Sequence, residues 1–178
     1  PTRAGPEIGV ASTKAFTAQL TVLISFAVAL AEAKGEISAE QADGIQANIQ
    51  SLPGQVGTAL SLFDVMRPIA HELSAARSAL FLGRDVLFPI ALEGALKLKE
   101  LSYIHAEGFA SGEMKHGPIA LIEEGLPVVA LLAADEVMGK AASNLREASA
   151  RGAKIILITE ERAAAEVDFA HSVVTVPN

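Results

Sequence analysis

The first 75 residues carry apolar side chains at helical spacing and contain no strand-like run. The pattern predicts three helices, from about Thr13 to Lys34, from Ser38 to just before Pro53, and over roughly residues 55–75. Gly35 lies where glycine commonly ends a helix. Ser38 and Gln41 have the spacing of a capping box, in which each side chain bonds the other residue's backbone N–H. Residues 10–75 are therefore expected to be helical throughout.

The pattern changes after residue 78, where short aliphatic runs alternate with helical stretches. Four strands are predicted, at residues 79–82, 127–132, 154–159 and 172–176, with helices opening near Pro89 and spanning about 136–151. Continuous apolar strands separated by helices are typical of a parallel sheet that is covered on both faces. The fold class is therefore α/β, with a helical domain at 1–75 and an α/β domain at 76–178.

Parallel sheets of this kind bind ligands at the carboxyl ends of their strands. Arg84 directly follows the strand predicted at 79–82. It can meet a phosphate there, although an arginine after a strand is more often a surface charge. Arg84 is therefore left out of the predicted site.

Residues 15–31 contain no charged side chain, which raises the question of a membrane span. Their length is at the short limit for crossing a bilayer. Hydroxyl side chains recur every four residues through this helix and form a polar stripe, at Thr13, Thr17, Thr21 and Ser25. That stripe suits a helix packed inside a protein or at a subunit interface better than one in lipid. The prediction is a buried helix, with no membrane partner.

Glu93, Lys97 and Glu100 are spaced four and then three residues apart, so they share one face of the helix that opens near Pro89. One interpretation is a solvated face with salt bridges worth a few tenths of a kcal/mol each. The other is a helix lining a cleft, with Glu100 as a proton carrier and Lys97 tuning its charge. Spacing alone favours the first, because structural ion pairs outnumber catalytic ones.

A glycine-rich stretch follows this helix and is predicted to be a loop ending at Lys115-His116-Gly117-Pro118. Its glycines, Gly108, Gly112 and Gly117, offer the backbone positive φ. Binding residues concentrate on such loops, and histidine titrates near neutral pH without help. A metal site formed by His105, Glu107, Glu113 and His116 is the weaker alternative. Glu113 and His116 have ligand spacing, three residues apart, but no further tight ligand cluster accompanies them. No metal and no cofactor are predicted.

Composition and charge narrow the function classes. The 178 residues are 51% hydrophobic but only 4% aromatic, and 21 acidic against 14 basic residues give a net charge of −7. The chain has no basic block, which makes nucleic acid an unsuitable partner. With no cysteine, the chain has no disulfide, thiolate metal site or cysteine nucleophile. The absence of a secretory signal fits a cytoplasmic protein.

Two long motifs carry a family resemblance. ALEGALKLKELSYIHAEGFASGEMKHGPIALI resembles the second sugar isomerase (SIS) subdomain of the glutamine–fructose-6-phosphate aminotransferase family. AGPEIGVASTKAFTAQLTVL resembles the end of the first SIS subdomain of the same family. The resemblance is collinear along nearly the whole chain. It implies that residues 1–75 are the helical end of the first subdomain. Residues 76–178 would then be the second subdomain, a three-layer sandwich around a parallel sheet.

The resemblance also implies roles for five residues. The family uses the glutamate of its LKLKE segment to move a proton between C1 and C2 of the sugar, which maps to Glu100. The histidine of its KHGP segment, here His116, opens the sugar ring and comes from the other subunit of a homodimer. Lys97 would orient Glu100 or a sugar hydroxyl. The VAS segment of the family touches the sugar, which assigns substrate contacts to Val10 and Ser12, although Ser12 or Thr13 can also simply cap a helix.

The implied reaction converts fructose 6-phosphate to glucosamine 6-phosphate. In the family, a glutaminase domain supplies ammonia from glutamine, and a serine- and threonine-rich loop binds the phosphate. Those parts and a C-terminal tail lie outside this sequence, so the isolated chain is expected not to use glutamine and to bind sugar phosphate weakly at best. Two alternatives stay open: a glucosamine-6-phosphate deaminase or other amino-sugar isomerase, and a non-catalytic phosphosugar sensor.

Overall fold

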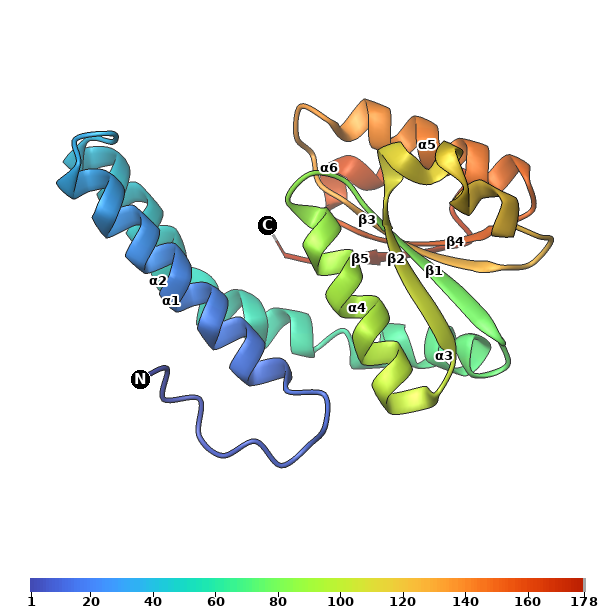
Figure 1. The fold of residues 1–178 in the computed structure, drawn as a ribbon, viewed down its shortest axis with the longest axis horizontal. Helices are drawn as coiled ribbons and strands as arrows, with labels where there is room; N and C mark the ends of the chain where they lie inside the picture. The colour runs from blue at the N-terminus through green and yellow to red at the C-terminus, as the bar shows by residue number, and fades with distance from the viewer. Residues whose placement is uncertain (178) are drawn as a thin grey trace. The chain divides into compact units, whose positions relative to one another are not determined.

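The computed structural model describes residues 1–177, which form two compact units, Pro1–Gly57 and a second unit from Thr58 onward (Figure 1). The helices are α1 (Thr13–Ala33), α2 (Ala39–Leu60), α3 (Phe63–Ser74), α4 (Leu87–Ser102), α5 (Met138–Ala150) and α6 (Glu161–Ala164), with 3₁₀ turns η1 (Ser111–His116) and η2 (Pro118–Leu121). The strands are β1 (Ser78–Gly83), β2 (His105–Ala110), β3 (Pro127–Leu132), β4 (Lys154–Thr159) and β5 (Ser172–Thr175). The predicted domain boundary after residue 75 stays a prediction.

In the first unit, local sequence signals set the turn between α1 and α2. Gly35 has φ of 73°, and the Glu36 N–H donates to the Ala31 carbonyl at 2.9 Å, which closes the end of α1. The capping box is confirmed. The Ser38 N–H donates to Gln41 Oε1 at 2.9 Å, and the Gln41 N–H donates to Ser38 Oγ at 3.2 Å.

The prediction that α1 is a buried helix is wrong for this chain. Val28 is its only buried residue, and Phe26 is 65% exposed. The hydroxyls of the polar stripe donate to carbonyls four residues earlier in the same helix, at Thr17, Thr21 and Ser25. They therefore need no partner from another element. By length and composition, α1 is the one helix in the described chain that could cross a membrane, which is weak evidence by itself.

The predicted helix break at Pro53 is also wrong. Helix α2 continues through Pro53 to Leu60, although proline removes one backbone hydrogen bond from a helix interior. The chain turns instead at Ser61, whose N–H donates to the Thr58 carbonyl at 3.0 Å. Helix α3 then starts at Phe63.

The second unit confirms the predicted α/β class. Its five strands are all parallel, in the order β2-β1-β3-β4-β5. Figure 1 shows helices on both sides of this sheet. One face packs against α3 and α4, and the other against α5, α6 and the 3₁₀ turns.

Alternating strand residues build a separate core on each face of the sheet. Leu80 and Leu82 of β1 pack into the core shared with α5, whereas Ala79 and Phe81 pack into the core under α3 and α4. This period of two places every other side chain on the same face. Both faces are apolar because both are covered by helices, as expected for a parallel sheet.

The predicted glycine-rich loop is a strand followed by a 3₁₀ turn, so that prediction is corrected. Residues 105–110 pair with β1 along its full length as the edge strand β2. Gly108 is needed for space and has no positive φ, because a Cβ there would lie 2.9 Å from the Leu92 Cα of α4. Of the three glycines in this stretch, only Gly117 has positive φ, at 143°.

Candidate functional site

Helix α4 presents the charged triad formed by Glu93, Lys97 and Glu100. It begins at Leu87 with Pro89 in its first turn, where the missing proline N–H costs nothing. Ala91 and Ala95 are buried against the sheet, so α4 approaches β1 and β2 closely. The three charged residues lie on another side of α4 and are partly buried.

Lys97 lies between the two carboxylates. Its Nζ is 2.9 Å from Glu100 Oε2 and 3.2 Å from Glu93 Oε1. The hydrogen bond to Glu100 is the main cause of a raised pKa of Lys97; burial opposes it as the second-largest effect, and the bond to Glu93 adds a smaller contribution that raises the pKa. Lys97 therefore stays protonated, and its ammonium group holds one oxygen of Glu100 in place. No hydrogen bond to Glu100 Oε1 occurs within the described residues, which leaves that oxygen available to exchange a proton.

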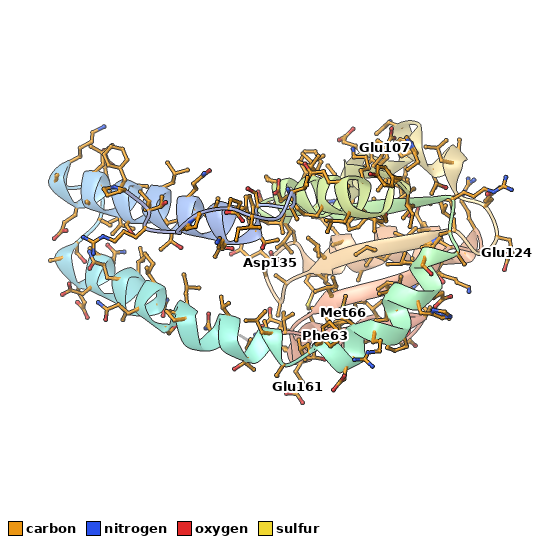
Figure 2. The ribbon with its side chains drawn as sticks, turned by 90° about the horizontal axis from the view of Figure 1, so that it is seen from below. Phe63, Met66, Glu107, Glu124, Asp135 and Glu161 are labelled. Carbon is orange, nitrogen blue, oxygen red and sulfur yellow. The ribbon has the colours of Figure 1, made fainter. Side chains whose placement is uncertain are left out.

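An apolar cavity of about 400 Å³ lies beside the triad, between α3, α4 and the sheet. Lys97 lines it, together with residues such as Met66 and Leu101, whereas Glu100 is not part of the lining. In Figure 2, Met66 is labelled on α3, and strands are visible between α3 and α4. The side chain of Glu100 keeps 29% of its area exposed, so it is accessible from solvent.

Glu100 lies near the amino edge of the sheet. Helix α4 connects two parallel strands, β1 and β2, so it must run back from the carboxyl edge to the amino edge. Glu100 is thirteen positions after Leu87 in the helix, and a rise of about 1.5 Å per residue places it roughly 20 Å along the helix.

His116 lies beyond the opposite edge. Strand β2 leads to the carboxyl edge, and η1 follows it and ends at His116. The ring of His116 is exposed, and no hydrogen bond or ion pair engages it within the described residues. Met114, which is fully buried, anchors η1 to the core. A single chain therefore does not bring Glu100 and His116 together.

Val10 and Ser12 belong to the first unit. Val10 is 74% exposed, and Ser12 has a left-handed backbone with φ of 54°. The alternative that Ser12 or Thr13 caps the helix is wrong, because no side chain caps α1. The Ser12 carbonyl accepts the first helical bond instead, from the Phe16 N–H at 3.1 Å.

Sequence reasoning missed a polar cavity at the carboxyl edge, where Lys115 pairs with Glu147 at 2.7 Å. These residues come from η1 and α5, and Arg84 joins them from the end of β1. Arg84 was the only residue of this cavity that the sequence indicated as a possible ligand contact. The fold adds Lys115 and Lys140 beside it, which no sequence pattern predicted. Across residues 1–177, no group of three His, Asp or Glu side chains is arranged to hold a metal ion.

Comparison with known proteins gives consistent matches. The SIS domain family model matches residues 72–177. The chain is 54% identical over 167 residues to glutamine–fructose-6-phosphate aminotransferase (isomerizing) of Mesorhizobium japonicum, and 51% identical over 176 residues to the same enzyme of Bradyrhizobium diazoefficiens. These matches cover 94% and 99% of this chain but only 28% and 29% of the relatives.

A solved structure agrees with the sequence matches. The C-terminal domain of glucosamine–fructose-6-phosphate aminotransferase from Francisella tularensis superposes with a TM-score of 0.94 at 43% identity. It covers 97% of this chain, which corresponds to 48% of that structure. The resemblance stated from the motifs is confirmed by these comparisons. The chain belongs to the SIS domain family.

Proposed function

We propose that this chain is the isomerase portion of a glutamine–fructose-6-phosphate aminotransferase, which forms glucosamine 6-phosphate from fructose 6-phosphate and ammonia. The observation that carries the proposal is the identity of 50% or more to relatives of that name along nearly the whole chain. The same similarity favours the aminotransferase over a deaminase or a phosphosugar sensor. Because the chain spans less than a third of those relatives, the glutaminase activity would belong to another part of the protein.

Glu100 is proposed to carry the proton. Ammonia condenses with the C2 carbonyl of the open-chain 2-keto sugar with loss of water. Conversion of that imine to the 2-amino aldose then requires removal of a proton from C1 and delivery of a proton to C2. One carboxylate on one side of the sugar can do both through an enol-like intermediate. Lys97 holds Glu100 Oε2 at 2.9 Å, so the other oxygen can face the substrate without the side chain rotating away. Lys97 is a positioning residue in this scheme, and its raised pKa keeps it charged.

His116 is proposed to open the sugar ring from the second subunit of a homodimer. Proton transfer requires heavy atoms within about 2.6–3.2 Å of one another. The length of α4 separates Glu100 from the edge that carries His116, so both can reach one sugar only if another copy of the chain supplies one of them. A two-fold dimer would do this twice, giving two identical sites. The exposed, unbonded ring of His116 supports this role.

Val10 and Ser12 are proposed to contact the sugar through their segment. Both lie just before α1, and the left-handed backbone at Ser12 leaves its hydroxyl out of the helix cap. We also place the protein in the cytoplasm, because the relatives it matches are named as enzymes of sugar-phosphate metabolism.

Mixed dimers test the shared site. Glu100→Gln and His116→Ala variants of the full-length enzyme are each expected to be nearly inactive in a glucosamine 6-phosphate assay. If the two residues act across the interface, each mixed dimer contains one site with both native residues. Random pairing of symmetric dimers then restores roughly a quarter of the native activity.

The control is a double variant with both substitutions in one chain, mixed with inactive Glu100→Gln chains. No site in that mixture has both native residues, so its activity should stay at the background. If the first mixture is also inactive, while each variant still forms dimers, the shared-site proposal is wrong.

A further inference from the structure

The carboxyl edge of the second unit contains a polar cavity of about 400 Å³ that the proposed reaction does not use. Its lining consists of Arg84, Gly112, Lys115, Gly139, Lys140, Ser143, Asn144 and Glu147. Neither Glu100 nor His116 belongs to this lining. The cavity therefore needs an explanation of its own.

The position of the cavity favours a ligand site. In the strand order β2-β1-β3-β4-β5, the order reverses between β1 and β3. Open parallel sheets bind ligands outside the carboxyl ends of their strands at such a reversal. Arg84 is the first residue after β1, and α5, which provides five of the lining residues, follows β3.

The charges of the cavity favour an anion. Three cations line it, against the single carboxylate of Glu147, which is engaged by Lys115 at 2.7 Å. Arg84 and Lys140 have no carboxylate partner among the described residues. The neighbouring acids Asp85 and Glu136 are exposed and do not line the cavity. This excess of positive charge occurs on a chain of net charge −7, so it is a local feature.

The framework around the cations is well defined. A Cβ at Gly112 would lie only 2.9 Å from Arg84 Nη1, so the guanidinium lies directly against the backbone of η1. The Asn144 side-chain amide donates to the Ser111 carbonyl at 2.6 Å and ties α5 to η1. The two elements that carry Lys115 and Lys140 are therefore held together before any ligand arrives.

We infer that this cavity binds the phosphate group of a small phosphorylated molecule. The arginine fork can donate two parallel hydrogen bonds to phosphate oxygens, and lysines add point charges. Ser143 offers a hydroxyl donor. The cavity lies at the edge of the sheet opposite to Glu100, roughly 20 Å away by the length of α4. A ligand bound there is out of reach of Glu100 of the same chain, and the inference rests only on the lining of the cavity, so it stands without the proposed function.

Titration with inorganic phosphate and with glycerol 3-phosphate tests the inference. Backbone amide shifts of the 178-residue chain would be followed by NMR at constant ionic strength, with chloride as the competing anion. Saturable shifts are expected at Gly112, Gly139 and Ser143. Arg84→Ala and Lys140→Ala should each weaken binding by roughly tenfold, the loss expected for a charge-assisted hydrogen bond. Lys99→Ala removes an exposed cation from α4 and should leave the affinity within about twofold.

A variant that changes no charge distinguishes a defined binding site from general electrostatic attraction. Gly112→Ala keeps every charge but displaces the Arg84 guanidinium, whose flexible end can move without harming the fold. It should weaken phosphate binding while the amide spectrum elsewhere is unchanged. The inference is overturned if shifts do not saturate, if chloride competes as well as phosphate, or if Lys99→Ala weakens binding as much as Arg84→Ala.

Discussion

At the amino edge of the sheet, Lys97 lies between two carboxylates, whereas at the carboxyl edge Arg84 and Lys140 have no acidic partner in the described chain. A second paired cluster lies at the amino edge, where Glu72 contacts Lys154 and His171. The two edges therefore differ in how far their charges are already satisfied.

This difference indicates different chemistry at the two edges. A charged ligand at the amino edge would have to compete with ion pairs that already exist, so that edge suits proton transfer by a positioned carboxylate. At the carboxyl edge, unpaired cations can meet an anion without breaking any bond. The catalytic role proposed for Glu100 and the phosphate inferred near Arg84 each depend on this contrast.

Glu100→Gln gives the strongest test of the amino edge. The amide keeps the shape of the side chain but cannot accept and return a proton, so kcat should fall about 10²- to 10⁴-fold. KM for fructose 6-phosphate should change little, because the lost interaction acts in the transition state. Steady-state kinetics of the full-length enzyme measure both quantities.

Glu93→Gln is the matched control on the same helix. Glu93 also pairs with Lys97, at 3.2 Å, but has no proposed part in proton transfer. Its effect on kcat should stay below about tenfold, as expected for a residue that only helps to hold Lys97. Equal losses in the two variants would show that the triad is a structural cluster.

Met114→Ala tests whether the carboxyl edge depends on its buried anchor. Met114 is fully buried and packs into the core shared with α5. Truncation of such a side chain costs about 2–5 kcal/mol of unfolding free energy. Urea unfolding should show this loss, and amide exchange at Lys115 and His116 should accelerate more than in β4. A loss below about 1 kcal/mol would mean that η1 is held by other contacts.

The sequence predicted the sheet well where strands are continuous aliphatic runs, as in 127–132 and 154–159, because burial on both faces leaves a strong pattern. Strand β2 was missed because HAEGFA lies at the sheet edge, contains polar residues and has a glycine at its centre. That glycine serves close packing with Leu92, a contact between segments that no local pattern reveals.

The candidate site shows the same limit. The spacing of Glu93, Lys97 and Glu100 on one helix gave the triad correctly. The separation of Glu100 from His116 could not be read from the chain, because it follows from α4 running against strands that all point the same way. The grouping of Arg84 with Lys140, which are far apart in sequence, likewise depends on the strand order.

Two glycine substitutions compare packing at the helix–strand contact with packing at the open cavity. Gly108→Ala should cost about 1–3 kcal/mol, because the new Cβ meets the Leu92 Cα backbone of α4. Gly112→Ala meets only the flexible end of Arg84 and should cost less than about 0.5 kcal/mol. Urea midpoints of the two variants measure the difference, and equal costs would contradict the distinction between a packed and an open glycine.

The smallest expected effect is the pH dependence contributed by Glu72 at the amino edge. A hydrogen bond from Lys154, followed by one with His171, lowers the pKa of Glu72 from its ordinary value of 4.5. A lowered pKa in the folded state stabilises the protein above the unfolded value, and this contribution is lost as the pH falls below 4.5 through the folded value. All three side chains are about one-third or more exposed, so the contribution should stay below about 1 kcal/mol.

Urea unfolding at pH 6 and pH 3 measures this contribution as the difference in unfolding free energy between the two pH values. That difference should be smaller for Glu72→Gln than for the native chain. Glu123→Gln, at an exposed position, should leave the native difference unchanged. If Glu72→Gln leaves this difference unchanged, the ion pairs of Glu72 contribute no stability. Their only effect would then be that the paired side chains are not available to bind a charged ligand.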